Sequence, residues 1–215
     1  MVCDVATNTV STRQAGAAVG EPTRPHLGGR QKVGGDGEPE VFVADEQRSV
    51  AMDLPRWRVL AEAVLGDEGV RGNVELSILF VEPDDIAALN EQFLGESRPT
   101  DVLAFPIDAV DVDVMSSPTS GRSGPDRPPP DPGDQPLLLG DVVVCPSVAQ
   151  SQAAEHAGAL DDELALLVVH GILHVLGYDH DQPDETAAMR ARELALLEAH
   201  HWNGPAPAGF RQEQS

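Results

Sequence analysis

Three histidines lie close together in an apolar part of the chain. The stretch HGILHVLGYDHD runs from His170 to Asp181. His170 and His174 are four residues apart, so on a helix their imidazoles lie on one face, where both can bind one metal ion. Gly177 can adopt the left-handed conformation that ends a helix, and the turn after it can return His180 toward the same ion. The spacing therefore predicts a metal site made of three histidines.

Three histidine ligands that leave one coordination position open are typical of a catalytic zinc site. Zinc there lowers the pKa of its bound water to about 7, which makes that water a nucleophile. Metzincin proteases have the same spacing, H-E-x-x-H-x-x-G-x-x-H, with a glutamate general base after the first histidine. Gly171 occupies that position here, which argues against a peptidase mechanism. The base would then be Asp179, Asp181, a carboxylate from elsewhere or the substrate itself.

Hydrophobic periodicity places regular elements around this motif. Strands are expected at 41–44, 73–81, 101–107 and 137–145, and helices at about 53–69, 83–94, 147–158, 161–176 and 184–201. In the first helix Asp53 is the expected N-cap and Gly69 the expected stop. The order predicts one α+β domain, in which helices flank a small mixed four-stranded sheet and 161–176 is a zincin-like metal-binding helix.

The flanking and inserted segments have a different composition. Residues 1–38 are rich in Gly, Thr, Arg and Pro without apolar periodicity, and we expect a disordered extension there. The folded domain is expected at 39–203, with a disordered tail at 204–215. Within the domain, residues 115–136 contain seven prolines and three glycines and are interpreted as an inserted loop, because strand patterns lie on both sides.

Charge and cysteine content narrow the functional class. The chain has 14 basic and 36 acidic residues, a net charge of −22, so its average field repels phosphate and disfavours indiscriminate nucleic-acid binding. Cys3 and Cys145 match no zinc or disulfide spacing, and Cys145 is interpreted as a small buried apolar residue. The N-terminus lacks the pattern of a secretory signal, and no apolar run is long enough for a membrane span. A cytoplasmic protein is expected.

Three motifs resemble those of a known family. HGILHVLGYDH resembles the signature of the YbeY endoribonucleases, bacterial proteins of 16S rRNA maturation and ribosome quality control. RPTDVLAFPID (98–108) is similar to the family segment P-T-[DN]-V-L-S-F-P, and GDVVVCP (140–146) is similar to its G-D-[IV]-x-I strand. The expected order of elements also agrees with the family fold, and the resemblance covers about residues 40–202.

The resemblance implies a role for several residues. His170, His174 and His180 correspond to the ligands of one Zn²⁺ per chain, and Thr100 and Asp101 become candidate substrate-binding residues, with Asp141 a weaker candidate. Many members carry an arginine that contacts RNA at the position of Leu94, and Arg98 is the nearest substitute, as a candidate for substrate binding and catalysis. The other catalytic candidate, Asp179, comes from the residues themselves, either as the general base or as a partner that orients a ligand imidazole. Ala104 replaces the family's serine. We interpret His156, His200 and His201 as surface residues.

The leading hypothesis is a zinc-dependent, single-strand-specific endoribonuclease that acts in 16S rRNA 3′-end maturation. Its partners would be the 16S rRNA precursor and components of the small ribosomal subunit, and neither DNA nor a membrane is expected. One alternative is a ribosome-assembly binding factor whose zinc is mainly structural. The other is a zincin-type metallopeptidase, which Gly171 disfavours.

Overall fold

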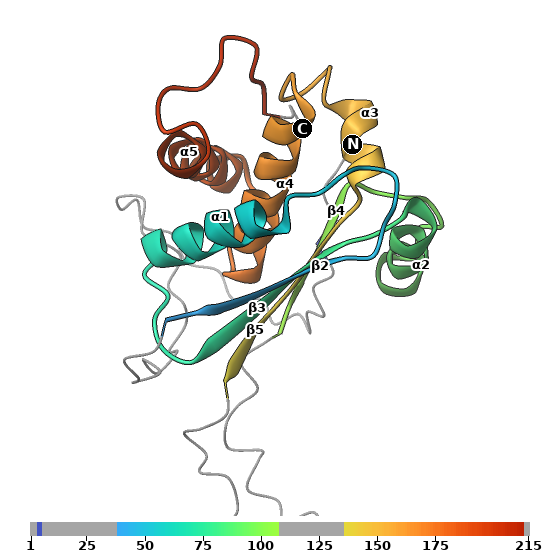
Figure 1. Ribbon diagram of the computed structural model, residues 1–215, viewed down its shortest axis with the longest axis horizontal. Coiled ribbons are helices and arrows are strands. Elements are labelled where there is room, and N and C mark those ends of the chain that lie inside the picture. Colours follow the sequence, from blue (N-terminus) through green and yellow to red (C-terminus); the bar gives the residue numbers. More distant parts are fainter. Residues whose placement is uncertain (1–3, 6–37, 108–135, 213–215) are drawn as a thin grey trace, which may run out of the picture.

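The computed structural model describes residues 4–5, 38–107 and 136–212 (Figure 1). The described elements, in chain order, are β1 (Asp4–Val5), β2 (Glu40–Asp45), α1 (Leu54–Asp67), β3 (Val74–Phe80), α2 (Pro83–Leu94), β4 (Val102–Pro106), β5 (Leu137–Val144), α3 (Pro146–Gln152), α4 (Leu160–Val175) and α5 (Pro183–His200). The predicted α+β class and the predicted order of elements are confirmed.

One mixed sheet organises the domain. Its strand order is β1-β4-β5-β3-β2, in which β2, β3 and β5 run parallel and β4 is antiparallel to β5. Helices α1, α4 and α5 gather on one side of the sheet, and α2 packs on the other (Figure 1). Successive strand residues point to opposite faces, so Val142 and Val144 belong to the core under α4, whereas Val143 packs with α2.

Helix α4 is the centre of the hydrophobic core. Nearly all of its surface is Leu, Val, Ile or Ala and is buried, and acids occupy its first turn, where the helix dipole favours them. Its end is a Schellman motif: the Gly177 N–H donates to the His174 carbonyl at 2.9 Å and the Tyr178 N–H to the Leu173 carbonyl at 3.0 Å. Gly177 has a φ of +91°, as its expected role in ending the helix requires.

The edge strand β1 was not predicted from the sequence. The four predicted strands are joined by β1, which pairs parallel to β4 through Asp4 and Val5. These two residues lie in the segment 1–38, which was expected to be disordered. A two-residue strand has no periodicity to detect, and backbone pairing with β4 is what forms it. The remainder of the extension and most of the insertion 115–136 lie outside the described residues.

The chain beyond α5 folds back onto the domain. The rings of Trp202 and Phe210 meet edge to face with centroids 4.7 Å apart, and both pack against the main core. The backbone N–H of Arg211 donates to the His156 carbonyl at 3.1 Å. The expectation of a disordered tail from residue 204 is therefore wrong for 204–212, because a single aromatic side chain anchors a segment whose composition resembles a loop. Among the described helices, none has the length and apolarity needed to cross a membrane.

Candidate metal centre

The three predicted histidines come together at the end of α4. Each offers one ring nitrogen, and these nitrogens all lie within 4.8 Å of one another. The Nε2 atoms of His170 and His174 are 3.0 Å apart. His180 approaches them from the turn after Gly177, with its ring 5.8 Å from that of His170 and 4.9 Å from that of His174, centroid to centroid. The helical spacing and the turn therefore bring the three histidines to one place, as the sequence predicts.

The partners of the other ring nitrogens fix the tautomers of two of these histidines. The Nδ1–H of His174 donates to the Tyr178 carbonyl at 3.0 Å, and the Nδ1–H of His170 donates to the carboxylate of Glu193 at 2.6 Å. In the neutral rings both Nε2 atoms are then acceptors. Two acceptors 3.0 Å apart repel each other unless a metal ion or a proton lies between them.

The donor set fits a divalent ion. Tetrahedral zinc, with Zn–N distances of about 2.0–2.1 Å, separates two ligand nitrogens by roughly 3.3 Å, close to the 3.0 Å between the Nε2 atoms. His174 is 3% exposed, and burial, followed by the neighbouring His170 and His180, lowers its pKa to about 2. Its ring is therefore neutral at physiological pH, the state in which imidazole binds a metal.

Contacts with α1 and α5 hold the turn that carries His180. The Tyr178 hydroxyl donates to Glu68 Oε2 at 2.9 Å, and Thr186 Oγ1 donates to the His180 carbonyl at 2.8 Å. Asp179 Oδ1 accepts the His180 backbone N–H at 2.7 Å. The exposed carboxylate of Asp179 thus helps shape the turn, and its assignment as a catalytic residue stays a prediction.

Glu193 is the residue of this centre that the sequence analysis missed. It is 3% exposed and lies on the buried face of α5 with Met189, Leu196 and Leu197. A carboxylate that orients a ligand imidazole fixes its tautomer and increases its basicity. The signal was present in the sequence, since an acidic residue interrupts an apolar helical stripe. Its partner could not be read there, because His170 is 23 residues away.

The position of Gly171 explains why no glutamate follows the first histidine. A Cβ built on Gly171 would lie 2.5 Å from Val142 Cγ1 and 3.4 Å from Val102 Cγ2. A side chain at this position would therefore point into the sheet, where there is no room for it. In this protein the residue after the first histidine packs α4 against the sheet, whereas in a metzincin the same position carries the general base.

Thr100 and Asp101 are buried at the start of β4. They are 1% and 2% exposed. The Thr100 hydroxyl donates to Asp101 Oδ1 at 3.0 Å, and the same oxygen accepts the Val102 N–H at 2.9 Å. These contacts stabilise the loop before β4, and Val102 in turn lies beside Gly171. The side chain of Arg98 is 46% exposed and forms an ion pair with Glu96. Substrate binding by these three residues stays a prediction.

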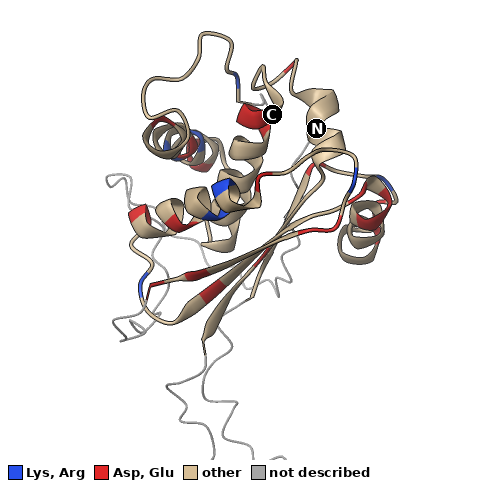
Figure 2. Ribbon diagram, in the orientation of Figure 1, with Lys and Arg blue, Asp and Glu red and all other residues tan. Residues whose placement is uncertain are grey.

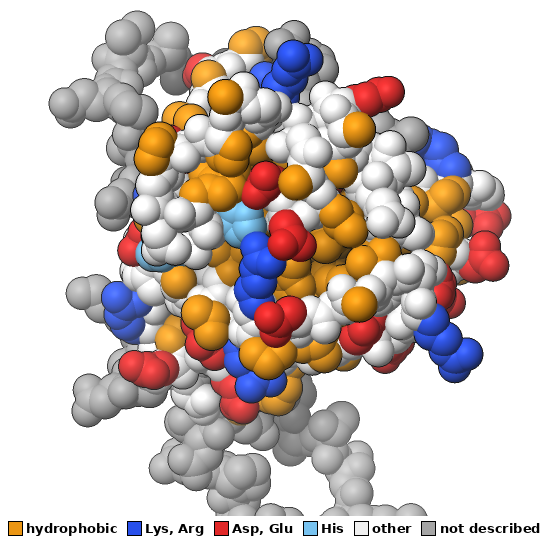
Figure 3. Space-filling model, turned by 45° about the horizontal axis from the view of Figure 1, so that its top comes forward, with side chains coloured by type: hydrophobic (Ala, Val, Ile, Leu, Met, Phe, Trp, Pro, Cys, Tyr) orange, Lys and Arg blue, Asp and Glu red, His pale blue; other side chains and the backbone are white. Residues whose placement is uncertain are grey.

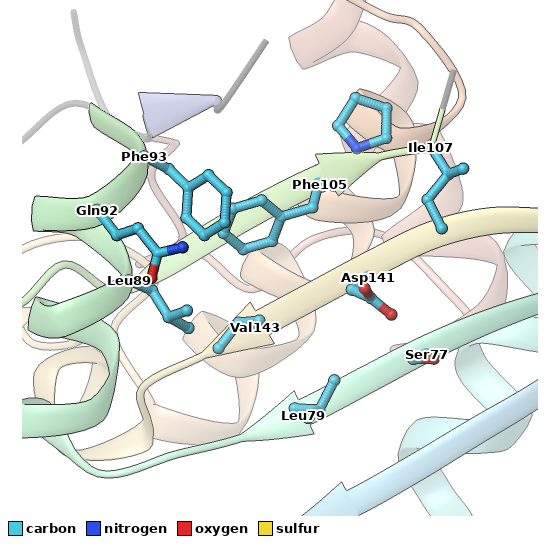
Figure 4. Close-up of a pocket in the computed structure, with 10 residues that line it drawn as sticks. Ser77, Leu79, Leu89, Gln92, Phe93, Phe105, Ile107, Asp141 and Val143 are labelled. Carbon is cyan, nitrogen blue, oxygen red and sulfur yellow. The ribbon is translucent and has the colours of Figure 1, made fainter. Parts of the chain in front are cut away.

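Asp141 lies on the sheet face opposite the histidines. It lines a cavity of about 830 Å³ between α2 and the sheet, together with Phe93, Phe105 and Val143 (Figure 4). The rings of Phe93 and Phe105 meet edge to face there, with centroids 4.9 Å apart. Because the adjacent Val142 packs under α4, Asp141 must point away from that helix. Its weaker candidacy as a neighbour of the metal site is therefore wrong.

The remaining described histidines pair with acids. His156 contacts Glu163 and His200 contacts Asp67, at 3.2 and 3.0 Å. His201 contacts Asp162 at 2.7 Å, and its side chain is only 4% exposed, so the interpretation of His201 as a surface residue is wrong. Trp202 Nε1 donates to the same Asp162 oxygen at 2.7 Å. This pairing across 39 residues, with Arg56 at the other ring nitrogen, places the ring between the first turns of α1 and α4.

Charge on the described surface is mixed. Asp and Glu are spread over the helices and strands, and arginines lie among them (Figure 2). The face in Figure 3 shows arginines next to carboxylates and hydrophobic side chains, and the described part of that face carries no broad basic area. Cys145 is fully buried, as its interpretation as an apolar residue requires.

Comparison with known proteins identifies the family of this chain. Residues 42–201 match the family described as endoribonuclease YbeY. A Frankia casuarinae protein of that name is 42% identical over 164 residues, covering 76% of this chain and 75% of that protein. A Salinispora tropica protein of the same name is 44% identical over 146 residues, covering 68% of this chain and 87% of that protein. The solution structure of a Thermotoga maritima protein is 24% identical, with a TM-score of 0.45, and covers 76% of this chain and 93% of that one. The family match and the curated relatives confirm the resemblance of the three motifs: this chain belongs to the endoribonuclease YbeY family.

Proposed function

We propose that this protein is a zinc-dependent endoribonuclease that cuts single-stranded RNA, with the 3′ end of the 16S rRNA precursor as its substrate. Family membership and the relatives' shared name support RNA cleavage. One observation carries the metal dependence: the Nε2 atoms of His170 and His174 face each other at 3.0 Å while both Nδ1 atoms are occupied by acceptors. We place its activity in the cytoplasm, where ribosomes are assembled.

The protein's own contribution is to hold three imidazoles in place. Glu193 orients His170, the Tyr178 carbonyl orients His174, and the turn fixed by Asp179 and Thr186 presents His180. When bound, the ion supplies Lewis-acid activation of a phosphate oxygen or of water. With Gly171 packed against the sheet, the exposed Asp179 and the RNA's own 2′-hydroxyl are the candidate sources of base and nucleophile.

The acidic surface shapes how RNA is recognised. A net charge of −22 disfavours long-range attraction of RNA. Binding then depends on the cation at the histidines, on Arg98 as a phosphate contact, and on docking to components of the small ribosomal subunit. The side chain of Arg98 is 46% exposed and pairs with Glu96, so a phosphate contact requires the guanidinium to exchange its present partners for the phosphate.

A cleavage assay tests the proposal. Zinc-loaded wild-type protein is incubated with a single-stranded RNA that contains the 16S rRNA 3′ end, beside the variants His174→Ala and His200→Ala. His200 pairs with Asp67 outside the cluster, so its variant is the matched control. We expect cleavage by wild type and His200→Ala and none by folded His174→Ala. A substrate with one 2′-deoxynucleotide at the cleavage site resists cutting if the 2′-hydroxyl is the nucleophile.

The outcomes separate the alternatives. If zinc-loaded wild type leaves the RNA intact, endonuclease action is refuted and a binding factor with a structural metal becomes the better description. Such a factor would lose its fold, measured by circular dichroism, in His174→Ala. Cleavage of casein that stops on chelation would favour a peptidase.

A further inference from the structure

The C-terminal segment reaches the carboxylate that supports the metal centre. Gln212 Nε2 donates to Glu193 Oε2 at 2.7 Å, while the other oxygen of Glu193 accepts from His170 Nδ1 at 2.6 Å. The same amide nitrogen donates to the Arg190 carbonyl at 2.8 Å. Gln212 is thus linked to a metal-ligand candidate through one intervening side chain.

Gln212 is held in place by the segment that precedes it. Phe210 packs against Trp202, and Trp202 Nε1 donates to Asp162 at the start of α4. The Arg211 N–H donates to the His156 carbonyl at 3.1 Å. Contacts between this segment and the folded domain therefore set the position of the Gln212 amide.

The carboxylate of Glu193 requires a partner on each oxygen. The residue is 3% exposed, and a buried carboxylate oxygen without a donor is costly. With only His170 as a partner, the carboxylate can rotate about its last bond and tilt the imidazole with it. A second donor on the opposite oxygen removes that freedom. Gln212 supplies the donor without adding charge.

We propose that Gln212 is a positioning residue of the metal centre, which fixes Glu193 so that Nε2 of His170 stays directed at the ion. This inference rests on the proposed metal site. Partners of ligand histidines change metal affinity by roughly 10–100-fold when removed. Gln212 is one hydrogen bond further from the ion than Glu193 is, so the lower end of that range applies, about tenfold.

The test measures metal affinity in the full chain, by competition for Zn²⁺ with a chromophoric chelator. Gln212→Met keeps the length of the side chain and removes its donor, so it separates hydrogen bonding from packing. Arg211→Ala is the matched control, because the exposed Arg211 contributes to the segment through its backbone. We expect Gln212→Met to raise the dissociation constant about tenfold and Arg211→Ala to leave it unchanged. The absorption of the Co²⁺ form should shift in Gln212→Met only.

A double variant tests whether the effect passes through Glu193. If it does, Gln212→Met adds nothing to the loss caused by Glu193→Gln, whereas two independent losses would overturn the proposal. An unchanged dissociation constant in Gln212→Met would also overturn the role of Gln212, but it would leave the proposed metal site intact. If wild type binds no zinc at all, the proposed metal centre fails first, and the two failures are thereby distinguishable.

Discussion

Replacing Gly171 by alanine tests the packing of the metal-binding helix on the sheet. The new Cβ would lie 2.5 Å from Val142 Cγ1 and 3.3 Å from Val142 Cγ2. A contact below 3.0 Å forces a neighbour to move, and Val142 is fully buried in β5. The strain must therefore pass to the sheet or to α4 itself.

Two opposing terms set the magnitude. Alanine in place of glycine favours a helix by about 1 kcal/mol, and overpacking of a core costs about 1–3 kcal/mol. The branched, fully buried neighbour places this site in the upper part of that range. We therefore expect Gly171→Ala to lower the free energy of unfolding by roughly 1–2 kcal/mol.

Urea denaturation of the metal-free protein measures this change. Gly66→Ala is the matched control, because a Cβ at Gly66 in α1 meets nothing within 4 Å; it should raise the free energy of unfolding by up to about 1 kcal/mol. Val142→Ala alone should cost roughly 2 kcal/mol by removing buried methyl groups. In the double variant the alanine at 171 fits, so the two changes should couple favourably by at least about 1 kcal/mol.

A Gly171→Ala variant that is as stable as wild type, or that gains stability as Gly66→Ala does, would show that position 171 is not strained against the sheet. Effects of Gly171→Ala and Val142→Ala that simply add would show that the contact with Val142 is not the source of the strain.

Three further predictions concern pH, metal and capping. In metal-free protein the folded pKa of His174, about 2, lies below its unfolded value of 6.5, so the unfolded state binds more protons between them. The free energy of unfolding should fall as the pH drops below 6.5, by at most about 1.4 kcal/mol per pH unit from this group; urea titrations at stepped pH should show that the free energy of unfolding depends less on pH in His174→Gln than in wild type, and an equal pH dependence in the two proteins would contradict the lowered pKa of His174. Zinc at 100 times its dissociation constant should stabilise the wild type by about 2.7 kcal/mol, measured with and without chelator, and a similar gain in His170→Ala would exclude that ligand. Asp53 Oδ1 accepts the Arg56 N–H at the start of α1; Asp53→Ala should cost about 1 kcal/mol in thermal unfolding followed by circular dichroism, and an unchanged midpoint would refute the cap.

Local rules were sufficient for the regular elements and for the histidine cluster. The Asp53 cap, the left-handed Gly177 and the burial of Cys145 agree with the structure. Each depends on neighbours within a few residues, or on one side chain's preference for burial. The i, i+4 spacing of His170 and His174 is likewise a property of helix geometry alone.

Contacts between distant segments could not be predicted in this way. His170 meets Glu193 across 23 residues, Glu193 meets Gln212 across 19, and Tyr178 meets Glu68 across 110. The burial of His201 and the folding back of residues 204–212 have the same origin.

The sequence by itself therefore determined the order of the elements and which side chains could bind a metal. Only the tertiary structure decided which carboxylate orients the ligand, that Gly171 faces the sheet, and that Asp141 faces away from the site. The physical reason is that helix and strand periodicities set the direction of a side chain along its own element, whereas its partner depends on how separate elements pack.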